Sequence, residues 1–168
     1  SGGGVFYSDA MEDLSNFAIK HNIPVTQTVM GYSTMKKDHS HFVGPIGGLG
    51  GKAANNLAKE TDLAICIGTK LADFTTGSWA NFENPEFKLV SINIARHDAN
   101  KHLAEAVIGD AKVTLTELSK AIGDWKSSDS WHKKSQVELK SWNEYVDKES
   151  GPTNQELPSY AHAVGAIY

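Results

Sequence analysis

The chain has 168 residues, 16 basic and 20 acidic side chains, a formal net charge of -4 and 40% hydrophobic residues. These values are typical of a globular chain with one domain and some additional residues, and they exclude a disordered chain. The acidic balance gives no electrostatic reason to expect nucleic acid or an anionic membrane as a partner. No apolar run approaches the roughly 20 residues of a transmembrane helix, and no signal peptide is evident. The single cysteine excludes an intrachain disulfide, so a reducing, cytoplasmic location is expected.

The two ends of the sequence predict a piece of a longer protein. It opens with Ser-Gly-Gly-Gly, a cluster that usually follows a strand, and we expect the first strand of the domain to be missing. It closes with a short helical pattern in which Ser159 is the expected N-cap and Ala161, Val164 and Tyr168 share a face.

Helices and strands are predicted to alternate through the first half of the chain. A helix capped by Ser8 and Asp9 carries Met11, Leu14, Ala18 and His21 on one face. Residues 24–29 form a β-branched strand, and residues 31–51 form a loop long enough to be functional. A second helix over residues 52–61 turns Ala53, Ala54, Leu57 and Ala58 inward.

The second half continues the alternation. Residues 63–67 are a continuous apolar run, the pattern of a strand buried on both faces. Strands follow at residues 87–94 and 106–108, and Asp110 caps a helix that runs through Leu115, Leu118 and Ile122 to Gly123. The expected fold is a doubly wound, mostly parallel Rossmann-like sheet with helices on both faces.

Beyond Trp125 the composition shifts to Ser, Lys, Asp and Trp. One amphipathic helix is predicted there, with Ser135, Leu139, Trp142, Tyr145 and Val146 on its apolar face. A linker over residues 148–157 follows it. The predicted organisation is therefore a Rossmann-like domain over residues 1–125, a helix and linker over residues 126–157, and the opening of another domain over residues 158–168.

Two glycine clusters are candidates for phosphate binding. In residues 44–51, Gly48, Gly50 and Ala53 match G-x-G-x-x-A ahead of a helix, where backbone N–H groups can approach a pyrophosphate. That fingerprint belongs directly after a strand, so a glycine-rich loop that crosses a neighbouring strand is the alternative. A P-loop is excluded because Lys52 is followed by Ala53. Residues 2–4 are the second candidate, with a tight turn as the alternative.

The remaining polar candidates are weaker. Residues 38–41, Asp-His-Ser-His, could present ligands to a metal, but two such histidines are more often simply exposed, and His97 and His102 invite the same interpretation. Cys66, within an apolar strand, is expected to be a small core residue with an inert thiol. Trp131 and Trp142 are expected to be packing anchors.

Several short sequence segments together resemble the central domain of thiamine-diphosphate-dependent enzymes. They are Gly-Thr-Lys-Leu-Ala-Asp-Phe-Thr-Thr-Gly-Ser at residues 68–78, Phe82 with Asn84-Pro85, Val-Ser-Ile-Asn-Ile at 90–94 and Asp-Ala-Asn-Lys at 98–101. Within that group, Asp-Phe-Thr-Thr-Gly-Ser, His-Asn-Ile-Pro-Val at 21–25 and Val-Ile-Gly-Asp-Ala-Lys at 107–112 favour the hydrolases that open trihydroxycyclohexane-1,2-dione in myo-inositol catabolism over acetolactate synthases. The resemblance covers roughly residues 2–125.

The resemblance implies a parent of three α/β domains that binds thiamine diphosphate and magnesium in its N- and C-terminal domains. Residues 158–168 would open the C-terminal cofactor domain. The thiamine ylid would break a ring C–C bond, and hydrolysis would release 5-deoxy-glucuronate. No catalytic or metal-binding residue carries over to this chain: Gly109-Asp110-Ala111 departs from the Gly-Asp-Gly motif of the metal site. The resemblance to flavin-dependent relatives implies nucleotide-site positions at Gly47, Gly50, Gly68 and Thr69, although the loop over residues 44–51 departs from their pattern.

Three hypotheses follow. The chain is the central, itself inactive domain of such a hydrolase, with the flanking domains as partners, a homo-oligomeric parent and no cofactor of its own. Alternatively, it is the middle domain of an acetolactate-synthase-like enzyme with an FAD or ADP site. The third hypothesis is a free-standing nucleotide-binding or assembly module.

Overall fold

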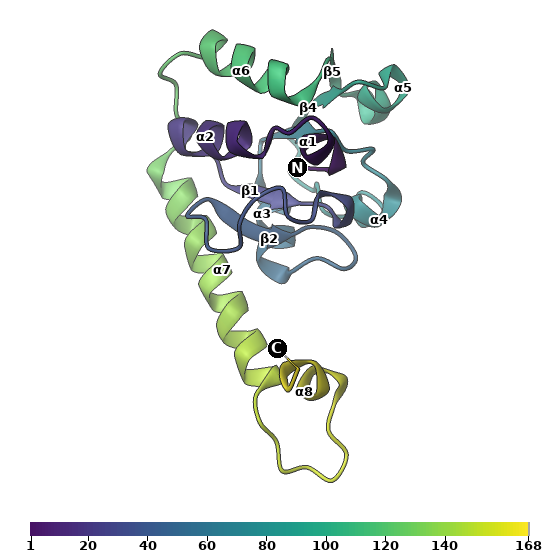
Figure 1. Ribbon diagram of the computed structural model, residues 1–168, viewed down its shortest axis with the longest axis vertical. Helices are drawn as coiled ribbons and strands as arrows, with labels where there is room; N and C mark the ends of the chain where they lie inside the picture. Colours follow the sequence, from purple (N-terminus) through teal and green to yellow (C-terminus); the bar gives the residue numbers. More distant parts are fainter. Residues whose placement is uncertain (168) are drawn as a thin grey trace.

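The computed structural model describes residues 1–167, and Tyr168 lies outside the described residues. The strands form two parallel sheets: β1 (Val25–Gln27) with β2 (Phe42–Pro45), and β3 (Leu63–Ile67), β4 (Lys88–Asn93) and β5 (Glu105–Ile108) in that order. The helices are α1 (Gly3–Tyr7), α2 (Met11–His21), α3 (Lys52–Glu60), α4 (Asp73–Thr76), α5 (Arg96–Ala99), α6 (Ala111–Ala121), α7 (Asp129–Ser150) and α8 (Tyr160–Gly165). Short 3₁₀ turns occur at η1 (Val29–Gly31) and η2 (Lys101–Leu103). The mixed, parallel α/β architecture confirms the predicted fold class (Figure 1).

Helices cover both faces of the strands, as a doubly wound fold requires. On one face, α1, α2 and α6 enclose the largest core cluster, which includes Leu14, Ile92 and Leu115. On the other face, α3 and α7 meet β2 in a cluster that contains Val43 and Leu57. The sequence predicted a single sheet. The described strands instead form two sheets, and the break lies between β1 and β3.

The helices follow from apolar periodicity and their end signals. In α2 the buried residues Leu14, Phe17, Ala18 and His21 recur at helical spacing, and Asn22 ends the helix in a left-handed conformation with φ 54°. All four predicted inward residues of α3 are buried. The predicted cap of α2 is wrong. Ala10 is its N-cap, whereas the Ser8 hydroxyl donates to the Gly4 carbonyl and closes α1 instead.

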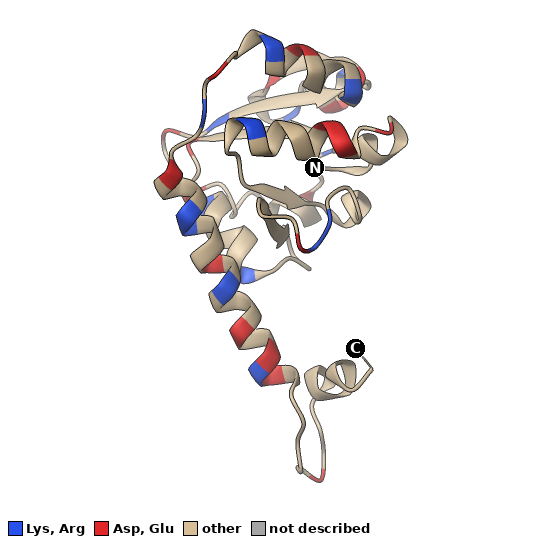
Figure 2. Ribbon diagram, turned by 60° about the vertical axis from the view of Figure 1, so that its left-hand side comes forward, with Lys and Arg blue, Asp and Glu red and all other residues tan. Residues whose placement is uncertain are grey.

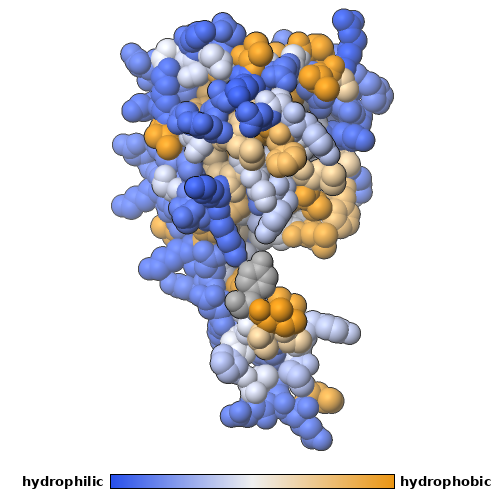
Figure 3. Space-filling view, in the orientation of Figure 1, coloured by the Kyte–Doolittle hydropathy of each residue, from blue (hydrophilic) through white to orange (hydrophobic). Residues whose placement is uncertain are grey.

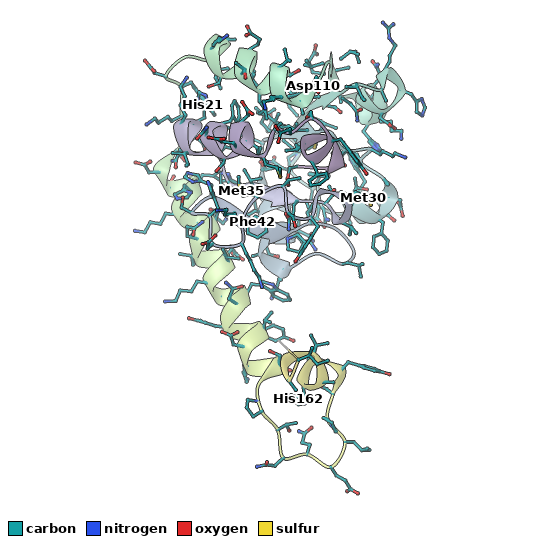
Figure 4. The ribbon with its side chains drawn as sticks, viewed as in Figure 1. His21, Met30, Met35, Phe42, Asp110 and His162 are labelled. Carbon is teal, nitrogen blue, oxygen red and sulfur yellow. The ribbon has the colours of Figure 1, made fainter. Side chains whose placement is uncertain are left out.

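Asp110 caps α6 as predicted, and Figure 4 shows it at the start of that helix. Its Oδ1 accepts from the backbone N–H groups of Lys112 at 2.9 Å and Val113 at 3.2 Å. We expect Asp110→Ala to lower the free energy of unfolding by about 1 kcal/mol, because two N–H groups at the helix end lose their acceptor. Asp110→Asn keeps an acceptor and should lose much less. Urea denaturation of the two variants tests this, and equal losses would contradict the capping role.

Two other sequence predictions are corrected by the structure. The loop predicted over residues 31–51 contains strand β2, which pairs with β1 in parallel. Strand β3 is not buried on both faces: Leu63 is 43% exposed and the next three residues are half-buried. Its side toward β1 is open, which explains that exposure. Glycines 2–4 lead into a helix, since Gly2 is the N-cap of α1 and the helix begins at Gly3.

Helix α7 runs from the domain toward α8 and carries both signs of charge along its length (Figures 1 and 2). Trp131, Leu139 and Trp142 pack against the buried cluster that contains Val43 and Leu57. This confirms the prediction that the two tryptophans are packing anchors. Tyr145 and Val146, predicted to be apolar contacts, are 54% and 38% exposed. The helix extends to Ser150, into the predicted linker.

Helix α8 begins as predicted, with the Ser159 hydroxyl accepting from the His162 N–H in a capping box. It ends at Gly165, earlier than the sequence pattern indicates, and Tyr168, expected on the same helical face as Ala161 and Val164, lies outside the described residues. Over residues 1–167, no helix is long and apolar enough to cross a membrane.

Candidate functional site

The carboxyl ends of β3 and β4 lie side by side, which is where open parallel sheets bind ligands. Thr69 follows β3, and Asn93 closes β4. The Asn93 side chain ties the two turns together: Nδ2 donates to the Thr69 carbonyl at 3.0 Å, and Oδ1 accepts from the Ala95 N–H at 2.9 Å. Sequence reasoning did not single out Asn93, although an asparagine at the end of an apolar strand is a usable signal.

The first glycine cluster packs directly onto the turn after β3. The Gly2 N–H donates to the Ile67 carbonyl at 2.8 Å, and the Gly4 N–H donates to the Gly68 carbonyl at 2.9 Å. A Cβ atom on Gly68 would lie 2.5 Å from the Gly4 Cα atom. Two backbone segments therefore approach more closely than any side chain allows, which explains these glycines without a ligand.

The second cluster folds against α4. Gly47 has φ +106°, and a Cβ atom there would lie 2.5 Å from the Phe74 carbonyl oxygen. Its N–H donates to Asn55 Oδ1 at 2.9 Å, and Asn55 Nδ2 returns a bond to the Gly47 carbonyl at 3.1 Å. The N–H groups of Gly48 and Gly50 donate to the carbonyls of Phe74 and Gly47, each at 2.8 Å. Asn55, which organises the loop, was also missed from sequence.

The four predicted nucleotide-site residues thus divide into two pairs. Gly68 and Thr69 lie with the N-terminal glycines, whereas Gly47 packs against α4 and Gly50 against the backbone of residues 45–47. Amides that would contact a phosphate in the second pair already have acceptors inside the chain. A nucleotide site at these four positions stays a prediction, and binding at the Gly47–Gly50 turn would require those hydrogen bonds to break.

Three histidines form a cluster where α7 meets the loop before β2. The rings of His41 and His132 stack with centroids 4.2 Å apart, and His39 lies 5.7 Å from His41. His41 was expected to be exposed but is only 7% exposed, because α7 covers it. Its Nε2 lies 3.2 Å from Asn22 Oδ1 and its Nδ1 3.0 Å from the Ser40 hydroxyl. The neutral ring satisfies both contacts, with Nε2–H donating and Nδ1 accepting.

Burial lowers the pKa of His41 to about 4, with further contributions from His132 and His39. The folded chain disfavours the charged His41 ring. The contribution of the neutral ring to the free energy of unfolding is therefore complete above about pH 6.5 and is lost as the pH falls toward 4. We expect urea denaturation to show a steeper loss of stability across that window in the native sequence than in His41→Gln. Equal slopes would show that His41 does not titrate as its surroundings require.

The other candidate side chains have structural contacts. His102 Nε2 lies 3.1 Å from the Leu71 carbonyl, and the His102 ring stacks on Trp79. His21, at the end of α2 in Figure 4, contacts the Trp125 carbonyl through Nδ1 at 2.8 Å and the Ser119 hydroxyl through Nε2 at 2.9 Å. Cys66 is half-buried beside a cavity, and burial raises the pKa of its thiol to about 11. Among residues 1–167, no group of three His, Cys, Asp or Glu side chains is placed to hold a metal ion.

The described residues also do not fit thiamine diphosphate. Magnesium and a diphosphate require a cluster of oxygen ligands, and the described part of the chain groups no such acidic side chains. The glycine amides that could bind a diphosphate donate to carbonyl or side-chain oxygens instead.

Comparison with known proteins accounts for most of the folded region. The family described as "Thiamine pyrophosphate enzyme, central domain" matches residues 1–118. The chain is 46% identical over 117 residues to the 3D-(3,5/4)-trihydroxycyclohexane-1,2-dione hydrolase of Clostridium perfringens (strain 13 / Type A), which covers 70% of this chain and 18% of that protein. It is 37% identical over 182 aligned positions to the hydrolase of the same name from Bacillus anthracis, which covers 98% of this chain and 28% of that protein.

A third relative, from Clostridium botulinum (strain Alaska E43 / Type E3), has the same name and is 43% identical over 121 residues. The alignment covers 72% of this chain and 19% of that protein. The chain therefore spans less than a third of the length of these relatives. The matched residues contain both parallel sheets and the glycine turns described above. By its sequence and its fold, the chain belongs to the central-domain family of thiamine pyrophosphate enzymes.

Proposed function

We propose that this chain is the central domain of a hydrolase that opens the ring of 3D-(3,5/4)-trihydroxycyclohexane-1,2-dione to 5-deoxy-glucuronate, and that it is inactive alone. The observation that carries the proposal is the 46% identity to such a hydrolase over 117 residues. The acetolactate-synthase-like alternative is not favoured, because relatives named as this hydrolase match at 37% to 47% identity.

In this proposal, flanking domains of the parent bind thiamine diphosphate and magnesium, and thiamine supplies the carbanion chemistry that breaks the ring C–C bond. The present domain spaces those two domains, and residues 158–168 open the second of them. The parent is a homo-oligomer in the cytoplasm. Residues 1–125 are the central domain in this proposal, and residues 126–157 are the helix and linker that follow it.

An apolar surface supports contact with a neighbouring domain or subunit. Figure 3 shows apolar side chains gathered on the side where η1 and α4 lie. Met30 of η1 is 74% exposed and Phe74 of α4 is 57% exposed. Exposed apolar patches commonly mark such contacts.

The test is ring opening of the diketone by the isolated chain and by the parent protein, both supplied with thiamine diphosphate and magnesium. We expect product only from the parent, and turnover by the isolated chain would overturn the proposal. A parent that turns over another substrate but not this diketone would equally overturn it. Phe74→Asp in the parent tests the surface separately: weaker domain or subunit association is expected, with an unchanged melting temperature of the isolated chain.

A separate measurement decides on the nucleotide alternative. Binding of FAD or ADP at a hundred times its dissociation constant would stabilise the chain by about 2.7 kcal/mol, and calorimetry would detect the rise in melting temperature. The proposed function expects no rise.

A further inference from the structure

Three histidines meet near the start of α7, where this helix covers the loop before β2. We call His39, His41 and His132 the histidine cluster. The His41 and His132 rings stack with their centroids 4.2 Å apart and their planes inclined by 25°. Figure 1 shows α7 leaving the domain toward α8. The histidine cluster therefore lies at the domain end of the helix that joins the domain to α8.

Asn22, at the end of α2, connects His41 to the start of α7. Its Oδ1 lies 3.2 Å from His41 Nε2. Its Nδ2 donates to the Ser127 carbonyl at 3.2 Å and to Asp129 Oδ1 at 3.1 Å. The same amide thus holds the buried ring and the beginning of α7, so a change at His41 acts directly on the attachment of the helix.

The contact between α7 and the domain leaves buried polar atoms unsatisfied. Among residues 1–167, the buried side-chain atoms without a hydrogen-bond partner in the chain include His39 Nε2, His132 Nδ1 and Gln136 Nε2. His39 Nδ1 accepts from the His41 backbone N–H at 3.1 Å, so the proton of the neutral His39 ring is on the unpaired Nε2. Release of α7 would hydrate these atoms, which offsets part of the free energy that the docked helix gains.

Helix α7 is held to the domain by few buried side chains. Ser135 is the one buried residue among the 22 residues of the helix. Trp131, Leu139 and Trp142 are only partly buried against the core cluster of α3 and β2. Elements with few buried apolar contacts open at a lower free energy than core elements. Because a helix gains most of its stability from packing, release also exposes the α7 backbone N–H groups to exchange.

The groups around His41 disfavour a proton on its ring. The titratable group that faces it from α7 is His132, and the one from its own loop is His39; a charge on either repels a charge on His41. The end of α2 contributes the uncharged Asn22 amide. The carboxylate of Asp129 is bonded to the opposite atom of that amide. Burial has the largest effect, and the pKa of His41 falls to about 4.

We propose that the histidine cluster is a pH-sensitive contact: protonation of His41 releases α7 from α3 and β2, while the core around α2 and α6 stays folded. Release uncovers the His41 ring, so water hydrates its charge. The position of α8 relative to the domain then depends on pH, because α7 is the element that joins them.

Hydrogen exchange of the 168-residue chain measures this release. His41 has a pKa of about 4 when α7 covers it, and an exposed histidine has one of about 6.5. Proton linkage then increases the opening equilibrium of α7 about tenfold between pH 7.5 and pH 5.5. We expect the protection of the α7 amides, corrected for the intrinsic exchange rate at each pH, to fall by that factor. This window lies above the range in which ordinary carboxyl groups titrate.

Urea separates release of α7 from unfolding of the whole chain. At pH 5.5 the α7 amides should exchange at least about tenfold faster than those of α6, whose Leu115 is in the largest core cluster. Local opening exposes little surface, so sub-denaturing urea should change α7 protection by less than about twofold while it lowers α6 protection. If the two helices have equal protection and equal urea dependence, α7 opens only with the whole domain and the proposal is wrong.

Two substitutions test His41 as the group that takes up the proton. His41→Gln keeps an amide N–H that can donate to Asn22, and His41→Phe keeps a ring that can stack on His132. Neither side chain titrates, so the fall in α7 protection between pH 7.5 and pH 5.5 should shrink below about twofold in both. His97→Gln, at an exposed position on α5, is the control and should keep the fall of about tenfold. An undiminished fall in either folded His41 variant, or its loss in the control, contradicts the proposal.

Discussion

Gly68→Ala is expected to lower the free energy of unfolding by about 3 kcal/mol, combining left-handed backbone strain with overpacking. Gly68 has φ +60°, and its Cβ atom would lie 2.5 Å from the Gly4 Cα atom and 2.9 Å from the Gly4 backbone nitrogen. The obstacle is backbone rather than the end of a flexible side chain, so it cannot swing aside. The Gly4–Gly68 hydrogen bond that anchors α1 would be lost with the displacement. Urea denaturation measures the loss.

Gly123→Ala is the matched control. Gly123 has nearly the same backbone angle, φ +61°, but nothing lies within 4 Å of the position of its Cβ atom. This variant therefore measures only the left-handed conformation, about 1 kcal/mol. If the two variants lose the same stability, the close approach of Gly4 contributes nothing, and the packing explanation of the N-terminal glycines is wrong.

The elements that sequence predicted well are those whose signals are local. Helix α6 combines a side-chain cap at Asp110 with Leu115 buried five residues later, and both signals operate within a few residues. Helix α3 likewise buries the face that its spacing indicates. Such elements need no knowledge of the rest of the chain.

Strand β2 was missed because its four residues include Gly44 at φ +104° and Pro45, both of which disfavour a strand. Its pairing with β1, some twenty residues earlier, stabilises it nonetheless. The burial of His41 has a similar cause, because the covering residue, His132, is ninety-one positions away and no local pattern connects them.

The candidate site shows the same limit. Sequence located the glycine turns but could not say where their N–H groups point. At Gly47 the answer depends on Asn55 in the next helix, whose side-chain oxygen accepts the bond that a phosphate would otherwise take. Residue type predicts that backbone can approach a ligand, whereas only the fold determines whether the amide is already engaged.

Cys66 is expected to react with iodoacetamide about a hundredfold more slowly in the folded chain than in concentrated urea near neutral pH, because the thiolate is the nucleophile and little of it forms. Burial in β3 raises the pKa of the thiol to about 11, and the nearby Ser1 ammonium, which favours the thiolate, offsets only part of that effect. Mass spectrometry of the alkylated chain follows both rates.

The pH dependence separates a raised pKa from simple obstruction. An ordinary thiol with a pKa of about 8.5 approaches its limiting rate near pH 9, whereas the rate at Cys66 should still rise about tenfold per pH unit there, because its pKa is about 11. A rate that is slow but levels off near pH 9 would mean that access alone limits the reaction. In that case the thiolate forms normally, and the cavity beside Cys66 is better solvated than its apolar lining indicates.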